Sequence, residues 1–140
     1  MSRYVVDASA AVKWYVPEDD SDAAETLLDG SHELHAPDLI LPEFGNIIWK
    51  KIRRNEITSN KGRQIIEAFL KTPVQKHSGE QLLEPAFEIA DRTAQTVYDC
   101  TYLALAVALN CEMVTADERF YKAIGQTPLA KHLLWVADLI

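Results

Sequence analysis

The sequence predicts an α/β fold in which a mostly parallel sheet is flanked by helices. Short apolar runs of strand length alternate with segments of helical spacing along the whole chain. The chain has 140 residues, 48% of them hydrophobic, which fits a single domain over residues 1–140 with a substantial core. The stretch 102–109 has almost no polar face, which is typical of a helix at the centre of such a fold.

Cap and turn residues separate the elements expected in the first half. Ser9 can cap a short helix that Pro17 ends, and Gly30 closes a second helix. Pro42 lies in the first turn of a long helix, where its missing N–H does little harm. The expected elements are a strand over 4–6, helices over 10–16 and 21–28, a strand over 32–36, and helices over 39–54 and 58–71.

The second half continues the alternation. Asp99 opens the most apolar helix and Asn110 ends it, while Thr115 and Glu118 match a capping box that starts the next helix. The expected elements are an extended piece over 73–77, helices over 78–94 and 99–109, a strand over 112–115, a helix over 115–124 and a strand over 133–136. In a sheet of this kind, ligands bind beyond the carboxyl ends of the strands.

Charge is unevenly distributed along the chain. Fourteen Lys and Arg against 21 Asp and Glu give a net charge of −7, which argues against a general nucleic-acid binder. By segment, residues 1–49 carry −8, residues 50–76 carry +6 and residues 77–140 carry −5, which together give −7. The basic middle segment indicates either a charged ligand or a pair of helices with solvated basic faces.

Carboxylates are placed where they can meet at the edge of the sheet that binds ligands. Asp7 ends the first strand, Asp117 comes two residues after the strand that ends at Thr115, and Asp99 opens the buried helix. Glu43 lies one turn into the long helix and can face the same edge. Taken singly, each has a structural explanation, as a first-turn helix residue, a turn residue or a surface residue. Together they predict a bound cation, and an oxygen-only cluster suits Mg²⁺ or Mn²⁺ acting on a phosphate ester.

The two cysteines and the N-terminus indicate the cellular compartment. Cys100 and Cys111 match no CxxC or zinc spacing, and both lie among apolar residues, so we expect two buried reduced thiols. The first residues contain no apolar stretch long enough for a signal peptide, so we expect none, and no window approaches the roughly 20 apolar residues of a membrane span. These features predict a soluble cytoplasmic protein with no membrane partner.

Each of the four carboxylates lies in a short motif. The motifs are Val5-Val6-Asp7-Ala8-Ser9-Ala10 with Lys13-Trp14, Pro42-Glu43, Tyr98-Asp99-Cys100-Thr101-Tyr102-Leu103-Ala104-Leu105-Ala106, and Val114-Thr115-Ala116-Asp117-Glu118-Arg119-Phe120. In this order and context they resemble the PIN domain family, and most closely the VapC toxins of bacterial and archaeal toxin–antitoxin pairs. The resemblance covers nearly the whole chain. It implies a three-layer α/β/α sandwich with a mostly parallel central sheet, in agreement with the alternation.

The resemblance also implies a function. The VapC proteins that the chain resembles are metal-dependent endoribonucleases. They serve as the toxin of a type II toxin–antitoxin pair and hydrolyse RNA phosphodiester bonds. Asp7, Glu43, Asp99 and Asp117 would form the family's acidic quartet, both catalytic and metal-binding, with Asp7 and Asp99 as the main ligands of Mg²⁺ or Mn²⁺. The implied partners are an RNA substrate, a cognate VapB-type antitoxin and a second copy of the chain in a homodimer.

Three polar residues are expected to support the quartet. Ser9 and Thr115 match hydroxyl positions that often support the acidic groups in this family, although helix capping explains them equally well. Asn46 comes one helical turn after Glu43 and can line the same site.

The long helix continues from Glu43 into a basic stripe. Lys50 and Arg54 share the face of Glu43 at steps of three and four, and Lys51 and Arg53 flank them. These four cations are the candidate RNA-binding residues, because they can carry phosphates while the carboxylates take only the scissile one.

Apolar and aromatic side chains close to these charges have a packing explanation. On the opposing face of the long helix, we assign Ile48 to the core and leave Trp49 open between core and a dimer surface. Trp14 is assigned to packing rather than base stacking.

Two further classes of function are open. A receiver-like phosphoacceptor domain would need an acidic pair at the first strand, where only Asp7 stands, and Asp38 is its nearest candidate acceptor. A dehalogenase-like phosphatase would need a second aspartate where Ser9 stands. The remaining alternative is a PIN fold that binds RNA or a partner without cleaving, which acidic residues at all four positions disfavour.

Overall fold

The computed structural model describes residues 2–139 and contains one five-stranded sheet in the order β3-β2-β1-β4-β5. All four neighbouring pairs are parallel, which confirms the predicted fold class. The strands are β1 (Ser2–Val6), β2 (His32–Pro37), β3 (Val74–His77), β4 (Glu112–Thr115) and β5 (Leu133–Trp135).

The central strand β1 decides where the site forms. It pairs with β2 on one side and with β4 on the other, where Val6 lies opposite Val114. The chain runs outward from β1 to β2 and β3, then returns to place β4 and β5 on the other side. The strand order therefore reverses between β1 and β4. At such a point the two connections leave the carboxyl edge in opposite directions and open a crevice for ligands.

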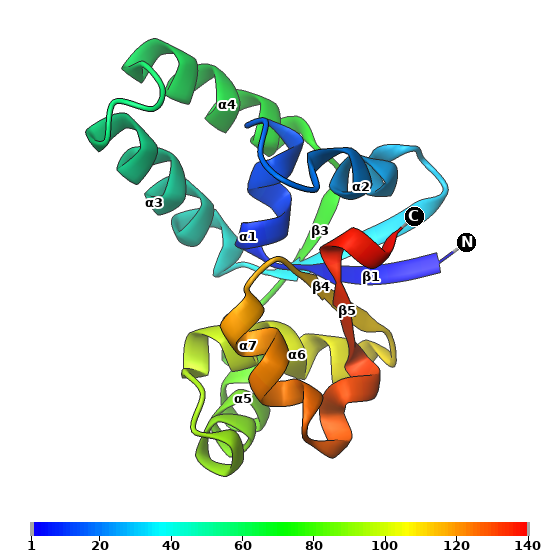
Figure 1. Ribbon diagram of the computed structural model, residues 1–140. Coiled ribbons are helices and arrows are strands. Elements are labelled where there is room, and N and C mark those ends of the chain that lie inside the picture. The colour runs from blue at the N-terminus through cyan, green and yellow to red at the C-terminus, as the bar shows by residue number, and fades with distance from the viewer. Residues whose placement is uncertain (1, 140) are drawn as a thin grey trace.

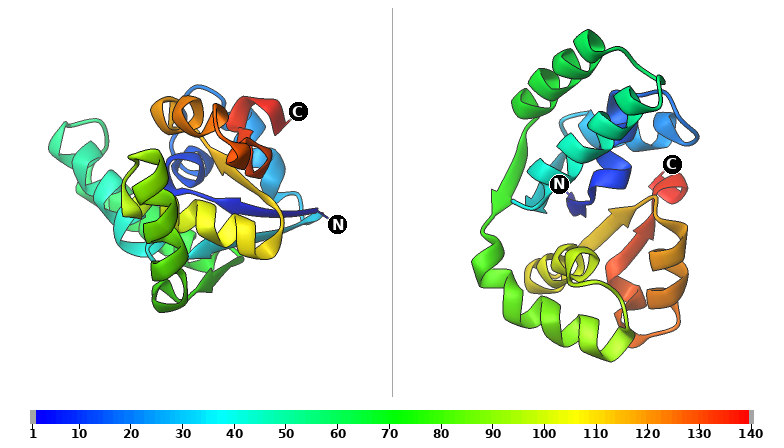
Figure 2. Two further views of the ribbon diagram at one scale, coloured as in Figure 1. Left: turned by 90° about the horizontal axis from the view of Figure 1, so that it is seen from below. Right: turned by 90° about the vertical axis from the view of Figure 1, so that its left-hand side faces the viewer.

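Helices cover both faces of the sheet. Figure 1 shows α1, α2, α3 and α4 on one side and α5, α6 and α7 on the other. The helices are α1 (Ala8–Ala11), α2 (Ser21–Glu25), α3 (Ile40–Arg53), α4 (Ser59–Lys71), α5 (Gly79–Thr93), α6 (Val97–Leu109) and α7 (Glu118–Gly125). Short 3₁₀ turns follow α1 and α2 and flank β5. The two helical layers confirm the expected sandwich, and Figure 2 shows β3 passing between them.

The buried helix α6 forms the centre of one layer. Seven consecutive residues, from Cys100 to Ala106, are buried, because α5 covers one side of the helix and the sheet covers the other. The apolar stretch in the sequence predicted this position. The helix begins earlier than the predicted Asp99, since the hydroxyl of Thr96 caps it by accepting the N–H of Asp99.

Two predicted helix caps are wrong. The cap of α1 is Asp7 rather than Ser9, since the Asp7 carboxylate accepts the N–H of Ala10. The cap of α7 is Asp117, which accepts the N–H of Phe120, rather than Thr115. The two hydroxyl residues, Ser9 and Thr115, each lie two residues from the cap and make other contacts, which are described below.

The predictions for three apolar side chains are resolved. Trp14 is buried and its indole N–H donates to the carbonyl of Ala24, which confirms a packing role. Ile48 belongs to the core, whereas Trp49 is 56% exposed and so is not a core residue.

The remaining sequence expectations concern thiols and membranes. Cys100 is a buried free thiol as expected, whereas Cys111 is also free but only half-buried, so the predicted burial of Cys111 is wrong. Burial raises the pKa of the Cys100 thiol to about 11, so it stays protonated at neutral pH. Among the helices of residues 2–139, none has the length and apolar character needed to cross a bilayer.

Candidate active site

All four predicted carboxylates line one cavity at the carboxyl edge of the sheet. The cavity has a volume of about 220 Å³ and lies at the carboxyl ends of β1 and β4, where the connections that leave the two strands diverge. Each carboxylate comes from a different part of the fold, so only the folded chain brings them together. The lining residues are Asp7, Ala8, Ser9, Glu43, Asn46, Ile47, Asp99, Tyr102 and Asp117.

Asp7 is the most deeply held of these carboxylates. Its side chain is buried, and one oxygen accepts the hydroxyl of Ser9 at 2.6 Å and the N–H of Ala10 at 2.9 Å. The other oxygen accepts the hydroxyl of Thr115. A carboxylate has about four lone-pair positions. These contacts use three of them and fix the orientation of the group, so one acceptor position on the second oxygen is left for a cation.

The two hydroxyls that hold Asp7 also join β1 to β4. Ser9 Oγ accepts the N–H of Ala116 at 3.0 Å, and Thr115 Oγ1 accepts the N–H of Asp117 at 3.0 Å. The segment carrying Asp117 is therefore tied to Asp7 through two hydroxyl bridges. This explains why Ser9 and Thr115 do not act as helix caps.

Glu43 is held by a residue that sequence reasoning missed. The hydroxyl of Tyr102 on α6 donates to Glu43 Oε1 on α3 at 2.5 Å, across the cavity. Tyr102 is 1% exposed, so the contact is shielded from water. Its position three residues after Asp99 could have identified it, because residues at that spacing share a helix face.

Burial and mutual repulsion shift the titration of three carboxylates. Burial raises the pKa of Asp7 from 3.8 to about 6, despite the hydrogen bonds that it accepts. Burial, with the charge of Asp99, raises the pKa of Glu43, and burial, with the charge of Asp117, raises that of Asp99. Each ionised form is thus unfavourable without a counter-charge, and a bound cation would supply one.

Comparison with known proteins agrees with this geometry. The sequence profile of the PIN domain family matches residues 4–125. The chain belongs to the PIN domain family. It is 36% identical over 120 residues to "Ribonuclease VapC3" of Pyrobaculum aerophilum, covering 84% of this chain and 91% of that protein. The family match excludes the receiver-like and phosphatase alternatives.

Solved structures show the same fold at lower identity. A crystal structure of PAE2754 from Pyrobaculum aerophilum superposes with a TM-score of 0.71 and 21% identity, covering 99% of this chain and 86% of that one. A structure of VapBC2 from Rickettsia felis, bound to a DNA fragment from their promoter, superposes with a TM-score of 0.62 and 12% identity, covering 95% and 98%. These superpositions show the fold, whereas the family match and the 36% identity to a VapC ribonuclease show that this PIN domain is of the VapC type.

The donor atoms of the cavity fit a hard divalent cation. Within residues 2–139, no three His, Cys, Asp or Glu side chains form a ready-made ligand set for one ion. The lining nevertheless supplies only carboxylate, amide and hydroxyl oxygens as metal ligands, with no His or Cys. Mg²⁺ is usually bound through one or two carboxylates and keeps several waters. The PIN domain thus offers the donor types that Mg²⁺ or Mn²⁺ requires.

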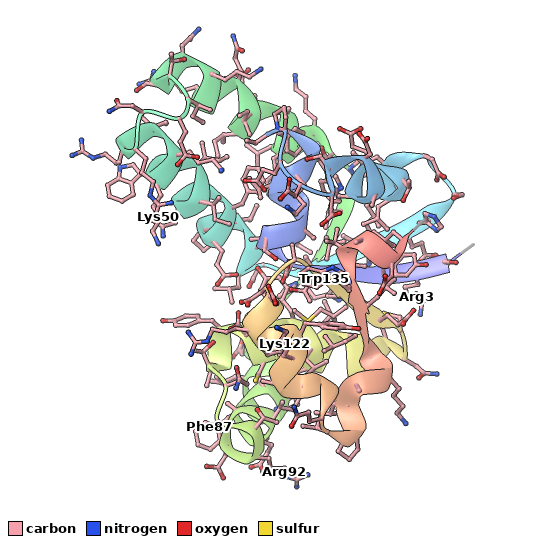
Figure 3. The ribbon with its side chains drawn as sticks, viewed as in Figure 1. Arg3, Lys50, Phe87, Arg92, Lys122 and Trp135 are labelled. Carbon is pink, nitrogen blue, oxygen red and sulfur yellow. The ribbon has the colours of Figure 1, made fainter. Side chains whose placement is uncertain are left out.

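The basic stripe is only partly available to a ligand. Lys50, Arg53 and Arg54 are exposed on α3, and Figure 3 shows Lys50 pointing away from the helix into open space. Lys51 instead pairs with Glu18 at 2.8 Å and with Glu56 at 3.4 Å, and its side chain is 13% exposed. Lys51 thus connects α3 to the segment that precedes α2. Asn46 lines the cavity beside Glu43, as its spacing indicated.

Proposed function

We propose that this PIN domain is a divalent-metal-dependent endoribonuclease, the toxin of a type II toxin–antitoxin pair. The observation that carries the proposal is the convergence of Asp7, Glu43, Asp99 and Asp117 on one cavity at the point where the strand order reverses. The curated relative with 36% identity is named a ribonuclease, which supports the same activity. A PIN domain that only binds RNA would have no need of four converging carboxylates.

The metal would be held mainly by Asp7 and Asp99, with Glu43 and Asp117 completing the site. When bound, Mg²⁺ or Mn²⁺ polarises the scissile phosphate and lowers the pKa of a bound water. The residues of the chain fix the geometry. Ser9 and Thr115 orient the Asp7 carboxylate, so that its remaining acceptor position has a set direction.

Tyr102 has a corresponding positioning role on the other wall. Its hydroxyl holds Glu43 at one oxygen and leaves the second oxygen to accept from water or to contact a cation. Because burial, together with the charge of Asp99, raises the pKa of Glu43, this group is suited to accept a proton from an attacking water.

The RNA backbone would follow α3 away from the cavity. Lys50, Arg53 and Arg54 lie about two to three helical turns beyond Glu43 and are exposed, so they can contact neighbouring phosphates. Lys51 contributes through its ion pairs to the position of the helix and not through phosphate contacts.

The proposed protein partners are a VapB-type antitoxin and a second copy of the chain. The Rickettsia felis structure contains a VapBC pair, which supports an antitoxin partner. An acidic cavity also favours an antitoxin segment that carries an arginine, because guanidinium groups pair with carboxylates in a bidentate manner. Exposed apolar side chains on α3 and α4, including Trp49 and Leu70, offer a surface for the homodimer.

The decisive experiment is a cleavage assay on structured RNA with purified protein. We expect cleavage with Mg²⁺ or Mn²⁺, products with 5′-phosphate and 3′-hydroxyl ends, and complete inhibition by EDTA. Asp99→Asn should abolish cleavage while circular dichroism shows an intact fold. Full activity in that variant would refute the site. RNA binding without cleavage under all metal conditions would favour the non-catalytic alternative.

The antitoxin is tested separately. Coexpression with the VapB-type antitoxin should yield a complex and restore growth. If no complex forms and growth is unaffected, the toxin assignment is contradicted.

A further inference from the structure

Tyr98 presents an unexplained aromatic surface at the start of α6. Its side chain is 64% exposed, more than any other large apolar side chain found exposed in residues 2–139. The stacked and edge-on aromatic pairs of the same residues do not include it. A ring that lies mostly in water buries little apolar area, so it contributes little to folding and is available to a ligand.

The position of Tyr98 relates it to the acidic cavity. It directly precedes Asp99 and lies one helical turn before Tyr102, and both of these residues line the cavity. Side chains on a helix lean toward its N-terminus, and α6 begins two residues before Asp99. Tyr98 itself does not line the cavity, so its exposed ring lies beside these two residues, toward the N-terminus of α6.

The two walls of the cavity mouth carry complementary chemistry. On the α3 wall, Lys50 and Arg54 continue outward from Glu43 and present cations. On the α6 wall, Tyr98 lies one helical turn before Tyr102 and presents an exposed ring. A single-stranded nucleic acid has the same division, with phosphates along one side and flat bases on the other. Binding grooves for such strands combine a basic track with aromatic rings.

We propose that Tyr98 forms a stacking subsite for a nucleobase next to the scissile phosphate. The inference rests on the proposed ribonuclease function and assigns the ligand class at the mouth of that site, an unpaired base. Because every base has a π-face, the subsite would select single-stranded or looped RNA over paired RNA without reading sequence. Tyr98 would position the substrate and take no part in proton transfer.

A binding assay tests the stacking directly. The probe is a fluorescein-labelled single-stranded uridine RNA of about 12 nucleotides, and the comparison strand has the same length with abasic ribose throughout. Ca²⁺ replaces Mg²⁺ to hold the strand uncut, as checked on a gel. Tyr98→Ala should raise the dissociation constant for the uridine strand about tenfold, equal to about 1.4 kcal/mol. The abasic strand should bind both proteins equally.

Two further variants make the test specific. Tyr98→Phe should bind like the wild type, because the ring is retained. Phe87→Ala is the matched control: Phe87 is 56% exposed on α5, and Figure 3 shows it on the lower helical layer, across the sheet from Lys50. The control should change neither dissociation constant.

The outcomes separate the two proposals. If Tyr98→Ala binds the uridine strand like wild type, or weakens both strands equally, the subsite is refuted while ribonuclease activity stands on its own assay. If the wild type shows the Tyr98-dependent preference for bases but cleaves no RNA with Mg²⁺ or Mn²⁺, the ribonuclease function fails and the subsite stands. A loss of dimer in sedimentation of Tyr98→Ala would assign the ring to the second copy and also refute the subsite.

Discussion

Replacing Asp7 with asparagine should make the metal-free protein more stable at neutral pH while abolishing cleavage. Burial raises the pKa of Asp7 from 3.8 to about 6. A shift of that size, at 1.36 kcal/mol per pKa unit, makes ionisation of Asp7 cost the folded state about 3 kcal/mol. Asparagine carries no charge and can still accept from Ser9 and Ala10, so it removes most of this cost.

The sign and the pH range of the effect follow from the raised pKa. The folded chain binds the Asp7 proton more tightly than the unfolded chain does. That contribution to stability is fully present below pH 3.8 and is lost as the pH rises through about 6. The advantage of Asp7→Asn should therefore be largest above pH 7, at about 3 kcal/mol, and fall below about 1 kcal/mol at pH 4.

Urea unfolding in EDTA at several pH values measures this difference. Asp91→Asn is a suitable control, because Asp91 is exposed on α5 and the change should leave stability nearly constant. Added Mg²⁺ should then stabilise the wild type and not Asp7→Asn, since binding to the folded state alone shifts the unfolding equilibrium. A variant less stable than wild type at pH 7.5 in EDTA, or a difference that does not narrow with acid, would refute the reasoning.

Three further predictions follow from named contacts. Tyr102→Phe keeps the buried ring but removes the hydroxyl that holds Glu43. In steady-state cleavage we expect kcat to fall about tenfold with KM nearly unchanged. A kcat equal to that of the wild type would show that the hydroxyl has no positioning role. Burial and the neighbouring imidazole lower the pKa of His77 below 6.5, so its contribution to stability is complete above pH 6.5 and is lost as the pH falls toward its folded pKa. His77→Gln should flatten that part of the curve of unfolding free energy against pH, and an unchanged slope would contradict the assignment. Lys50→Ala should weaken RNA binding and reduce the slope of log K against log salt by about 0.7. Lys51→Ala should instead lower the stability to urea and leave that slope unchanged. The reverse pattern would show that Lys51, and not Lys50, contacts the phosphates.

The fold could be predicted largely from the sequence because its signals are local. Strands β1, β4 and β5 each contain a short apolar run, and the stretch 102–109 identified the central helix. The order of the strands could not be derived in this way, since it depends on which long-range pairs form. The position of Asp7 at the end of the first strand nevertheless indicated the ligand-binding edge, because parallel strands bring their carboxyl ends to one side.

Local capping rules failed for two hydroxyl residues at the candidate site. Ser9 and Thr115 are good cap residues by type, but a buried carboxylate needs hydrogen-bond donors more than a helix end needs an acceptor. Both hydroxyls therefore donate to Asp7, and aspartates take over the two caps. Such departures from local preference are expected where side chains are arranged for function. Tyr102 was missed for a related reason, since its hydroxyl acts across two helices that only the fold brings together.

Counting charges along the sequence misjudged the basic segment in both directions. The net charge of −7 seemed to exclude nucleic acid, yet the carboxylates of the cavity would be offset locally by a bound cation. The net charge of +6 over residues 50–76 overstates the positive charge that is free to contact RNA phosphates, because Glu18 from the acidic first segment pairs with Lys51 as well as with Lys13. Glu18 thus gives the acidic first segment a structural role, because its ion pair with Lys51 holds α3 in position. The cations left exposed on α3 are then Lys50, Arg53 and Arg54, and a strand bound there meets positive charge on the side that leads into the carboxylates.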